Sequence, residues 1–247
     1  MNSAETAVAG SRERGGDHLK PLEVFKRILY KERLKLRRIW PVLAGFNLLA
    51  GLYLFVETRH LFRMDHAEIV WYRTIELGHI YYGMLRYVPA ATGLLLAVSQ
   101  FLPEMRDERL RLSLHLPVRA HTMILSHMLV GSVLLAALTT VSAAALAAVT
   151  GIYFPRELVE LALATAAPWF LAGWCCYLGA ALALLEPGLK LRIFNLLLTA
   201  GLAAPLLAQA GPGVYADAFP RLLLLPPLLL GAVLLPAHHF RHRRVDS

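Results

Sequence analysis

The sequence has few charged residues and almost no cysteine. Of its 247 residues, 17% are charged, against about 25% in a typical soluble domain. Its two cysteines, Cys175 and Cys176, are neighbours inside an apolar stretch, so they predict no disulfide framework. Residues 1–20 lack the apolar core of a secretory signal, and we interpret them as an uncleaved, disordered cytoplasmic tail.

Recognisable catalytic motifs are also missing. The sequence has no GxxxxGK(S/T) phosphate loop, no HExxH, no CxxC and no GxSxG. His60, Met64 and His66 match no strong metal-ligand spacing, and no carboxylate or cysteine completes them, so we interpret them as ordinary interfacial residues. We therefore expect a chain that is not an enzyme and that holds no cofactor and no metal of its own.

The sequence does have long apolar blocks. It is 57% hydrophobic with a mean hydropathy of +0.53, and the apolar residues gather into stretches long enough to cross a bilayer. We predict an all-α integral membrane protein with one transmembrane domain over residues 21–240 and a cytoplasmic tail over 241–247. Six transmembrane helices are placed at about 39–56, 80–102, 122–150, 161–185, 193–209 and 222–240.

Two of these stretches raise questions of conformation. Residues 122–155 carry no formal charge. They are too many for one simple crossing and too few for two, so we favour a long helix, or one bent near Gly131 or Gly151. The last span contains Pro226, Pro227 and Pro236, which predict a bent or partly broken helix.

Lysine and arginine are distributed unevenly about the spans. Of the 25 in the chain, 19 lie before the first span, in the loops around residues 103–121 and 186–192, or in the C-terminal tail. Because cytoplasmic loops are enriched in these residues, we expect both termini in the cytoplasm. The same pattern argues against nucleic-acid binding, since the basic residues flank apolar blocks and form no single basic face.

Two segments outside the spans are amphipathic. Residues 21–40 place Leu36 and Trp40 on an apolar face and many basic residues on the rest. This pattern favours an interfacial helix that binds membrane lipids, and the alternative is a solvated basic extension of the first span. The first outer loop, residues 57–76, is predicted to form a short interfacial helix with Trp71 and Tyr72 in the aromatic belt.

Arg86 is the one residue with a formal charge inside a predicted span. A charged residue in a span is by default a functional hypothesis, and Arg86 could line a polar pathway with Glu76, Tyr81 or Asn47. Alternatively, the span is shorter and Arg86 extends to the outer interface.

The most informative segment, residues 103–121, is dense in charge between two apolar blocks. The chain must leave the membrane here and re-enter at once, because a charged side chain at the bilayer centre costs about 3 kcal/mol or more. Its residues run from an acidic position, Glu104 or Glu108, through arginines and a leucine-rich stretch to Pro117, Val118 and Arg119.

With six spans around it, this segment resembles the coupling helix of ABC transporter permeases of the type-2 exporter class. The resemblance implies a surface that docks into a separate ATPase subunit. The residues of that surface would be Glu104, Arg106, Asp107, Glu108, Arg109, Leu110, Arg111, Leu114, Pro117 and Arg119. Its leucines alternate with polar residues as in a strand, while the resemblance favours a helix over about 104–114 followed by an extended turn to Pro117.

The resemblance further implies a permease subunit in the bacterial inner membrane, paired with a second copy or a sister permease above two ATPase subunits that bind the ATP. The exported substrate is not specified by the sequence. Two alternatives stay open: a membrane scaffold or assembly subunit that transports nothing, and a haem-exporter-like permease that would use the outer histidines.

Overall fold

The computed structural model describes residues 30, 34–106, 120–186, 188–208 and 211–242. All regular elements in these ranges are helices, and no strand occurs among them. In chain order the helices are α3 (Ile39–Met64), α4 (Ala67–Ile75), the 3₁₀ helix η1 (Gly83–Tyr87), α5 (Val88–Arg106), α7 (Ala120–Tyr153), α8 (Arg156–Leu185), α9 (Leu189–Leu206), α10 (Phe219–Leu222) and α11 (Leu225–His242).

Five stretches of helix within the described residues are long and apolar enough to cross a membrane. They are Ile39–Met64, Gly83–Pro103, Ile124–Tyr153, Arg156–Leu185 and Leu189–Leu206. The prediction of an all-α, multi-pass membrane protein is confirmed at this level. The region of the sixth predicted span contributes a shorter apolar stretch, Phe219–Val233, within the described residues. A sixth crossing therefore stays a prediction.

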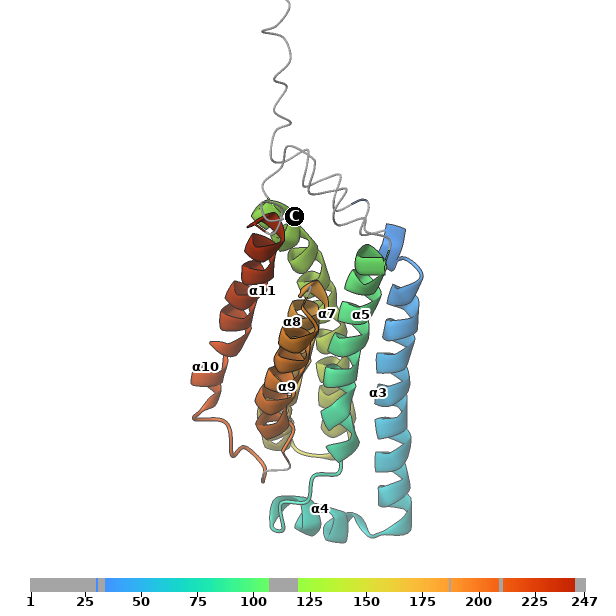
Figure 1. Ribbon diagram of the computed structural model, residues 1–247. Helices are drawn as coiled ribbons and strands as arrows, with labels where there is room; N and C mark the ends of the chain where they lie inside the picture. Colours follow the sequence, from blue (N-terminus) through green and yellow to red (C-terminus); the bar gives the residue numbers. More distant parts are fainter. Residues whose placement is uncertain (1–29, 31–33, 107–119, 187, 209–210, 243–247) are drawn as a thin grey trace, which may run out of the picture.

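The long helices stand side by side and alternate in direction (Figure 1). The short helix α4 lies across one end of this bundle, which we call the α4 end. At the opposite end α5 finishes and α7 begins, and we call this the connector end because residues 107–119 join the two helices there. The start of α3 and the end of α11 also lie at the connector end.

Several helix boundaries differ from the expected ones. α3 continues past residue 56 to Met64, because Leu54 and Thr58 keep the buried face of the helix in register with the bundle. The predicted outer loop is thereby shortened, and the short helix expected within it is present as α4. The long uncharged stretch forms the single helix α7 of 34 residues, about 51 Å in length.

The prolines of the last apolar stretch mark a break between two helices. α10 is only four residues long and ends at Leu222. α11 then begins at Leu225, with Pro226 and Pro227 in its first turn. Proline is well tolerated there, since the first-turn amides have no partner within the helix. The predicted interruption is thus present, at residues 223–224.

Helix α8 forms the centre of the bundle and packs against α5, α7, α9 and α11. Close approach depends on glycine. A Cβ atom on Gly173 would lie 2.7 Å from the carbonyl oxygen of Pro89 in α5, and one on Gly179 would overlap Thr199 in α9. Small residues let the backbones of membrane helices meet, because packing, rather than hydrophobicity, drives their association in lipid.

Candidate functional site

Three clusters of buried polar side chains connect the helices. The first, the asparagine cluster, joins α3, α5 and α7. Asn47 donates from Nδ2 to Thr92 Oγ1 at 3.1 Å and to the Leu43 carbonyl at 2.8 Å, and it accepts from Ser142 Oγ at 2.7 Å. All three polar side chains are almost fully buried. Buried polar groups in an apolar bundle need such partners, so this cluster fixes the mutual positions of three helices.

The second group, the tyrosine cluster, joins α5, α7 and α8. Tyr177 donates from its hydroxyl to Gln100 Oε1 at 2.8 Å. Gln100 in turn donates from Nε2 to the backbone carbonyl of His127 at 2.8 Å. The phenol fits because position 131 is glycine, where any Cβ atom would overlap the Tyr177 hydroxyl. α5 is thus linked to α7 at two separate levels. At one level Thr92 of α5 is linked through Asn47 of α3 to Ser142 of α7. At the other, Gln100 of α5 bonds directly to the His127 carbonyl of α7.

The third group, the outer cluster, lies at the α4 end. Tyr81 and Thr150 share a hydrogen bond of 2.6 Å between their hydroxyl oxygens, and the Tyr81 ring stacks on Phe154 with centroids 5.0 Å apart. Burial raises the pKa of Tyr81 to about 12, against a smaller lowering by the bond to Thr150, so the phenol is neutral at physiological pH.

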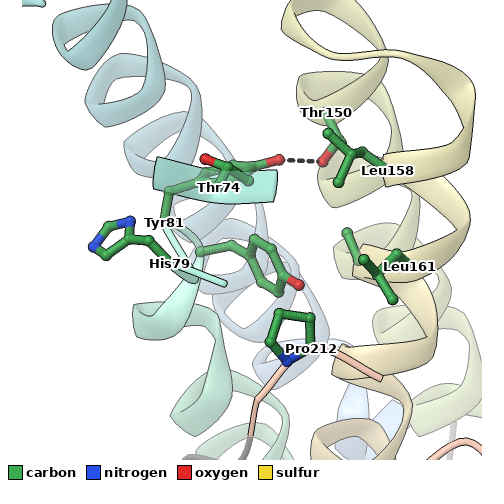
Figure 2. Close-up of a pocket in the computed structure, with 9 residues that line it drawn as sticks. Thr74, His79, Tyr81, Thr150, Leu158, Leu161 and Pro212 are labelled. Carbon is green, nitrogen blue, oxygen red and sulfur yellow. Dashed lines mark hydrogen bonds between the residues drawn. The ribbon is translucent and has the colours of Figure 1, made fainter. Parts of the chain in front are cut away.

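The outer cluster surrounds a small cavity of about 10 Å³, room for roughly one water molecule. Figure 2 shows this cavity between the segment that carries Tyr81 and the helix residues Thr150 and Leu161, with Pro212 beside it. Other residues that line it are Thr74, His79, Tyr82, Leu158 and Ala162. A cavity of this size in this conformation has no room for an organic substrate.

Two glycines bring the outer connections into contact at this cavity. Gly78 has φ 61° and lies against Pro212. A Cβ atom added to Gly78 would lie 3.2 Å from Cδ of Pro212. Gly213 has φ 71°, and its amide donates to Thr165 Oγ1 of α8 at 3.0 Å. Both backbone conformations favour glycine. The connection from α4 to α5 and the connection from α9 to α10 therefore close the α4 end together.

The three residues expected along a polar pathway lie in separate places. Asn47 belongs to the asparagine cluster and Tyr81 to the outer cluster. Arg86 lies in η1, where its guanidinium donates to the hydroxyl of Tyr87. No hydrogen bond in the described part of the chain joins any two of the three. Among the described residues each of the three therefore has its own hydrogen-bond partners, and a pathway that includes all three stays a prediction.

Most of the expected docking surface falls outside the described residues: Asp107, Glu108, Arg109, Leu110, Arg111, Leu114, Pro117 and Arg119. Glu104 and Arg106 belong to the last turn of α5, and only their backbone is described. The place where the segment must emerge is nevertheless defined, because α5 ends and α7 begins at the connector end (Figure 1).

Most of the residues that bond helix to helix, other than Asn47, were not singled out in the sequence. Four of them are isolated polar residues inside apolar stretches: Thr92, Gln100, Ser142 and Tyr177. Their isolation was the feature of the sequence that could have identified them as contacts between helices. The two cysteines lie in α8, where Cys175 is buried. Within the ranges that the structure describes, no three His, Cys, Asp or Glu side chains come together as a metal site would require.

Comparison with known protein families, curated proteins and solved structures gives no match to this chain. The arrangement is a bundle whose helices are joined by buried hydrogen bonds, closed at the α4 end and linked at the other end by a charged connector.

Proposed function

We propose that this chain is the membrane-spanning permease subunit of an ABC transporter of the type-2 exporter class. In this proposal it crosses the bacterial inner membrane six times, with both termini and the connector in the cytoplasm. The supporting observation is mechanical. The charged connector joins α5 and α7, and these are the two helices that the asparagine cluster and the tyrosine cluster bond together at two levels.

A force on the connector would reach the whole bundle through these bonds. A separate ATPase subunit would bind the connector, with Leu110 and Leu114 in an apolar groove and charged residues such as Glu108 at its rim. Closure of two ATPase subunits on ATP would then push α5 and α7 together. α5 would carry the movement to α8, since Pro89 packs directly on Gly173.

The charges of the described helix ends support this orientation. At the connector end the described charged residues next to the spans are mainly basic: Lys35, Arg37, Arg38, Arg106, Lys190, Arg192 and Arg241, with Glu104 and Glu186 as the acidic exceptions. At the α4 end acidic and basic residues are mixed, as in the pair of Arg73 and Asp65 at 2.8 Å. An excess of lysine and arginine on one side marks the cytoplasmic side of a membrane protein.

The closed α4 end fits a resting state of a two-state exporter. The outer cluster and the two glycine turns leave a cavity of only about 10 Å³. Release of a substrate on that side would require the outer connections to separate. Closure of the ATPase subunits at the connector end would shift the equilibrium toward that open state. ATP, two ATPase subunits and a second permease, identical or related, complete the proposed assembly.

The test is copurification with the cognate ATPase. We expect Glu108→Arg combined with Leu114→Asp to abolish copurification while membrane insertion is retained, because the groove would then face a reversed charge and a buried carboxylate. The matched control is Glu160→Arg combined with Leu77→Asp, the same exchanges on exposed residues of the α4 end. Normal copurification of the first double variant would overturn the docking assignment.

A further inference from the structure

Arg86 and Tyr87 form a pair at the edge of a membrane span. Arg86 is partly buried in η1, and the apolar stretch Gly83–Pro103 begins three residues before it. The guanidinium carbon lies 4.5 Å from the centroid of the Tyr87 ring, within the range of a cation–aromatic contact. The same guanidinium donates to the Tyr87 hydroxyl, so the ring and the hydroxyl together fix its orientation.

The positive charge of Arg86 is not neutralised within the described part of the chain. The salt bridges there are those of Arg73 with Asp65 and of Arg156 with Glu160. The Nε atom of Arg86 is buried and has no hydrogen-bond partner. A partly buried guanidinium with no carboxylate beside it is unfavourable at the edge of hydrocarbon, and an anion from outside the protein would pair with its accessible part.

The surroundings of the pair are apolar and exposed. Tyr87 is 56% exposed and Met84 is 44% exposed, on the same short helix. A small soluble anion bound to Arg86 would leave the apolar surface of Tyr87 and Met84 exposed. A ligand with a phosphate and attached acyl chains would satisfy both, because the phosphate meets the arginine while the chains lie along the apolar surface of the span.

We propose that Arg86 and Tyr87 bind the phosphodiester of a membrane phospholipid in the leaflet on the α4 side. The arginine presents a planar fork of N–H donors that suits two phosphate oxygens. Tyr87 holds the fork in place through its ring and its hydroxyl. The site is independent of the proposed transport function, since it needs neither the ATPase nor the connector.

The experiment is a lipid titration of the full chain in detergent, read by native mass spectrometry and by thermal unfolding. Three probes separate the sources of binding: phosphatidylglycerol, diacylglycerol without phosphate, and soluble glycerol phosphate without acyl chains. We expect retention and a raised unfolding temperature with phosphatidylglycerol only. Equal binding of diacylglycerol, or of soluble glycerol phosphate, would overturn the proposal in favour of a purely apolar contact or a free-anion site.

Variants localise the effect to the pair. Arg86→Gln is expected to weaken phosphatidylglycerol binding about tenfold, the loss of roughly one charge-assisted hydrogen bond. The control is Arg156→Gln, at the same end, whose side chain is 89% exposed and lies near Glu160. It should bind as the unmodified chain does. Equal losses in both variants would mean general charge attraction and no site.

Two milder variants decide the matter if Arg86→Gln does not fold. Tyr87→Phe keeps the ring and removes the hydroxyl, so we expect about a threefold loss of affinity. Arg86→Lys keeps the charge and loses the fork, and a comparable or larger loss is expected. If both bind phosphatidylglycerol as tightly as the unmodified chain, the proposed site does not exist.

Discussion

Helices α8 and α9 are almost equally apolar, yet they occupy opposite positions in the bundle. Both contain a stretch apolar enough to cross a membrane, yet 78% of that stretch is buried in α8 and only 17% in α9. α9 has a narrow buried face of four residues spaced about one turn apart, and α8 is covered on nearly every side. Hydropathy therefore identifies a span without indicating its place in the bundle.

The difference lies in how closely other backbones can approach. α8 contains Gly173 and Gly179 at contacts with α5 and α9, and it contributes the buried Tyr177 hydroxyl. α9 contains Gly201, around which a Cβ atom would meet nothing within 4 Å. In lipid, small residues and interhelical hydrogen bonds hold helices together, because lipid tails are as apolar as the side chains they replace.

The largest expected effect comes from Gly173→Leu in α8. Its Cβ would lie 2.7 Å from the Pro89 carbonyl oxygen and 3.0 Å from the Pro89 Cβ, so backbone atoms of α5 would have to move. We expect a loss of about 3 kcal/mol or more in the free energy of unfolding in detergent. The matched variant Gly201→Leu should be neutral or slightly stabilising, since glycine is a poor helix former. Equal damage from both would contradict the assignment of α8 to the centre.

Deletion of side-chain volume tests the same contrast with a smaller effect. Leu178 in α8 is 2% exposed and Leu197 in α9 is 67% exposed. Leu178→Ala should cost about 2–4 kcal/mol through lost contacts and a cavity, whereas Leu197→Ala should cost less than about 0.5 kcal/mol because detergent or lipid fills the space. Denaturant titration of both variants measures this. A cost above about 1 kcal/mol at Leu197 would show that another protein surface covers α9.

The sequence predicted the class of fold and most helices, and the reasons for its errors are physical. Apolar runs located the spans, because the bilayer requires long apolar helices whatever their neighbours are. The end of α3 was missed because Glu57, Arg59 and Arg63 suggested a loop. A helix can continue into the headgroup region, where its charged residues are solvated and its buried face, at Thr58, still packs.

The polar contacts were harder to predict than the helices. Asn47, Tyr81 and Arg86 were grouped because each is polar or charged near a span, yet each has different partners in the structure. Which polar residues meet depends on helix rotation and on close approach at glycines such as Gly131. Neither is determined by periodicity in a helix that is apolar on all sides.

The smallest effect expected concerns single hydroxyl groups on the two helices. Tyr177→Phe in α8 removes the donor to Gln100 Oε1, a bond between helices at 2.8 Å. Such bonds contribute about 1 kcal/mol in membrane bundles, so the free energy of unfolding should fall by about that amount.

Thr199→Val in α9 is the counterpart. The Thr199 hydroxyl donates to the Asn195 carbonyl of its own helix at 2.6 Å, and valine preserves the shape against Gly179. We expect a change below about 0.5 kcal/mol, because this carbonyl belongs to the helix and the bond links no second element. Paired unfolding curves measure both variants under one condition. If Thr199→Val proved the more damaging, the stability of α9 would depend on its own polar face, and the contrast with α8 would no longer rest on interhelical contacts.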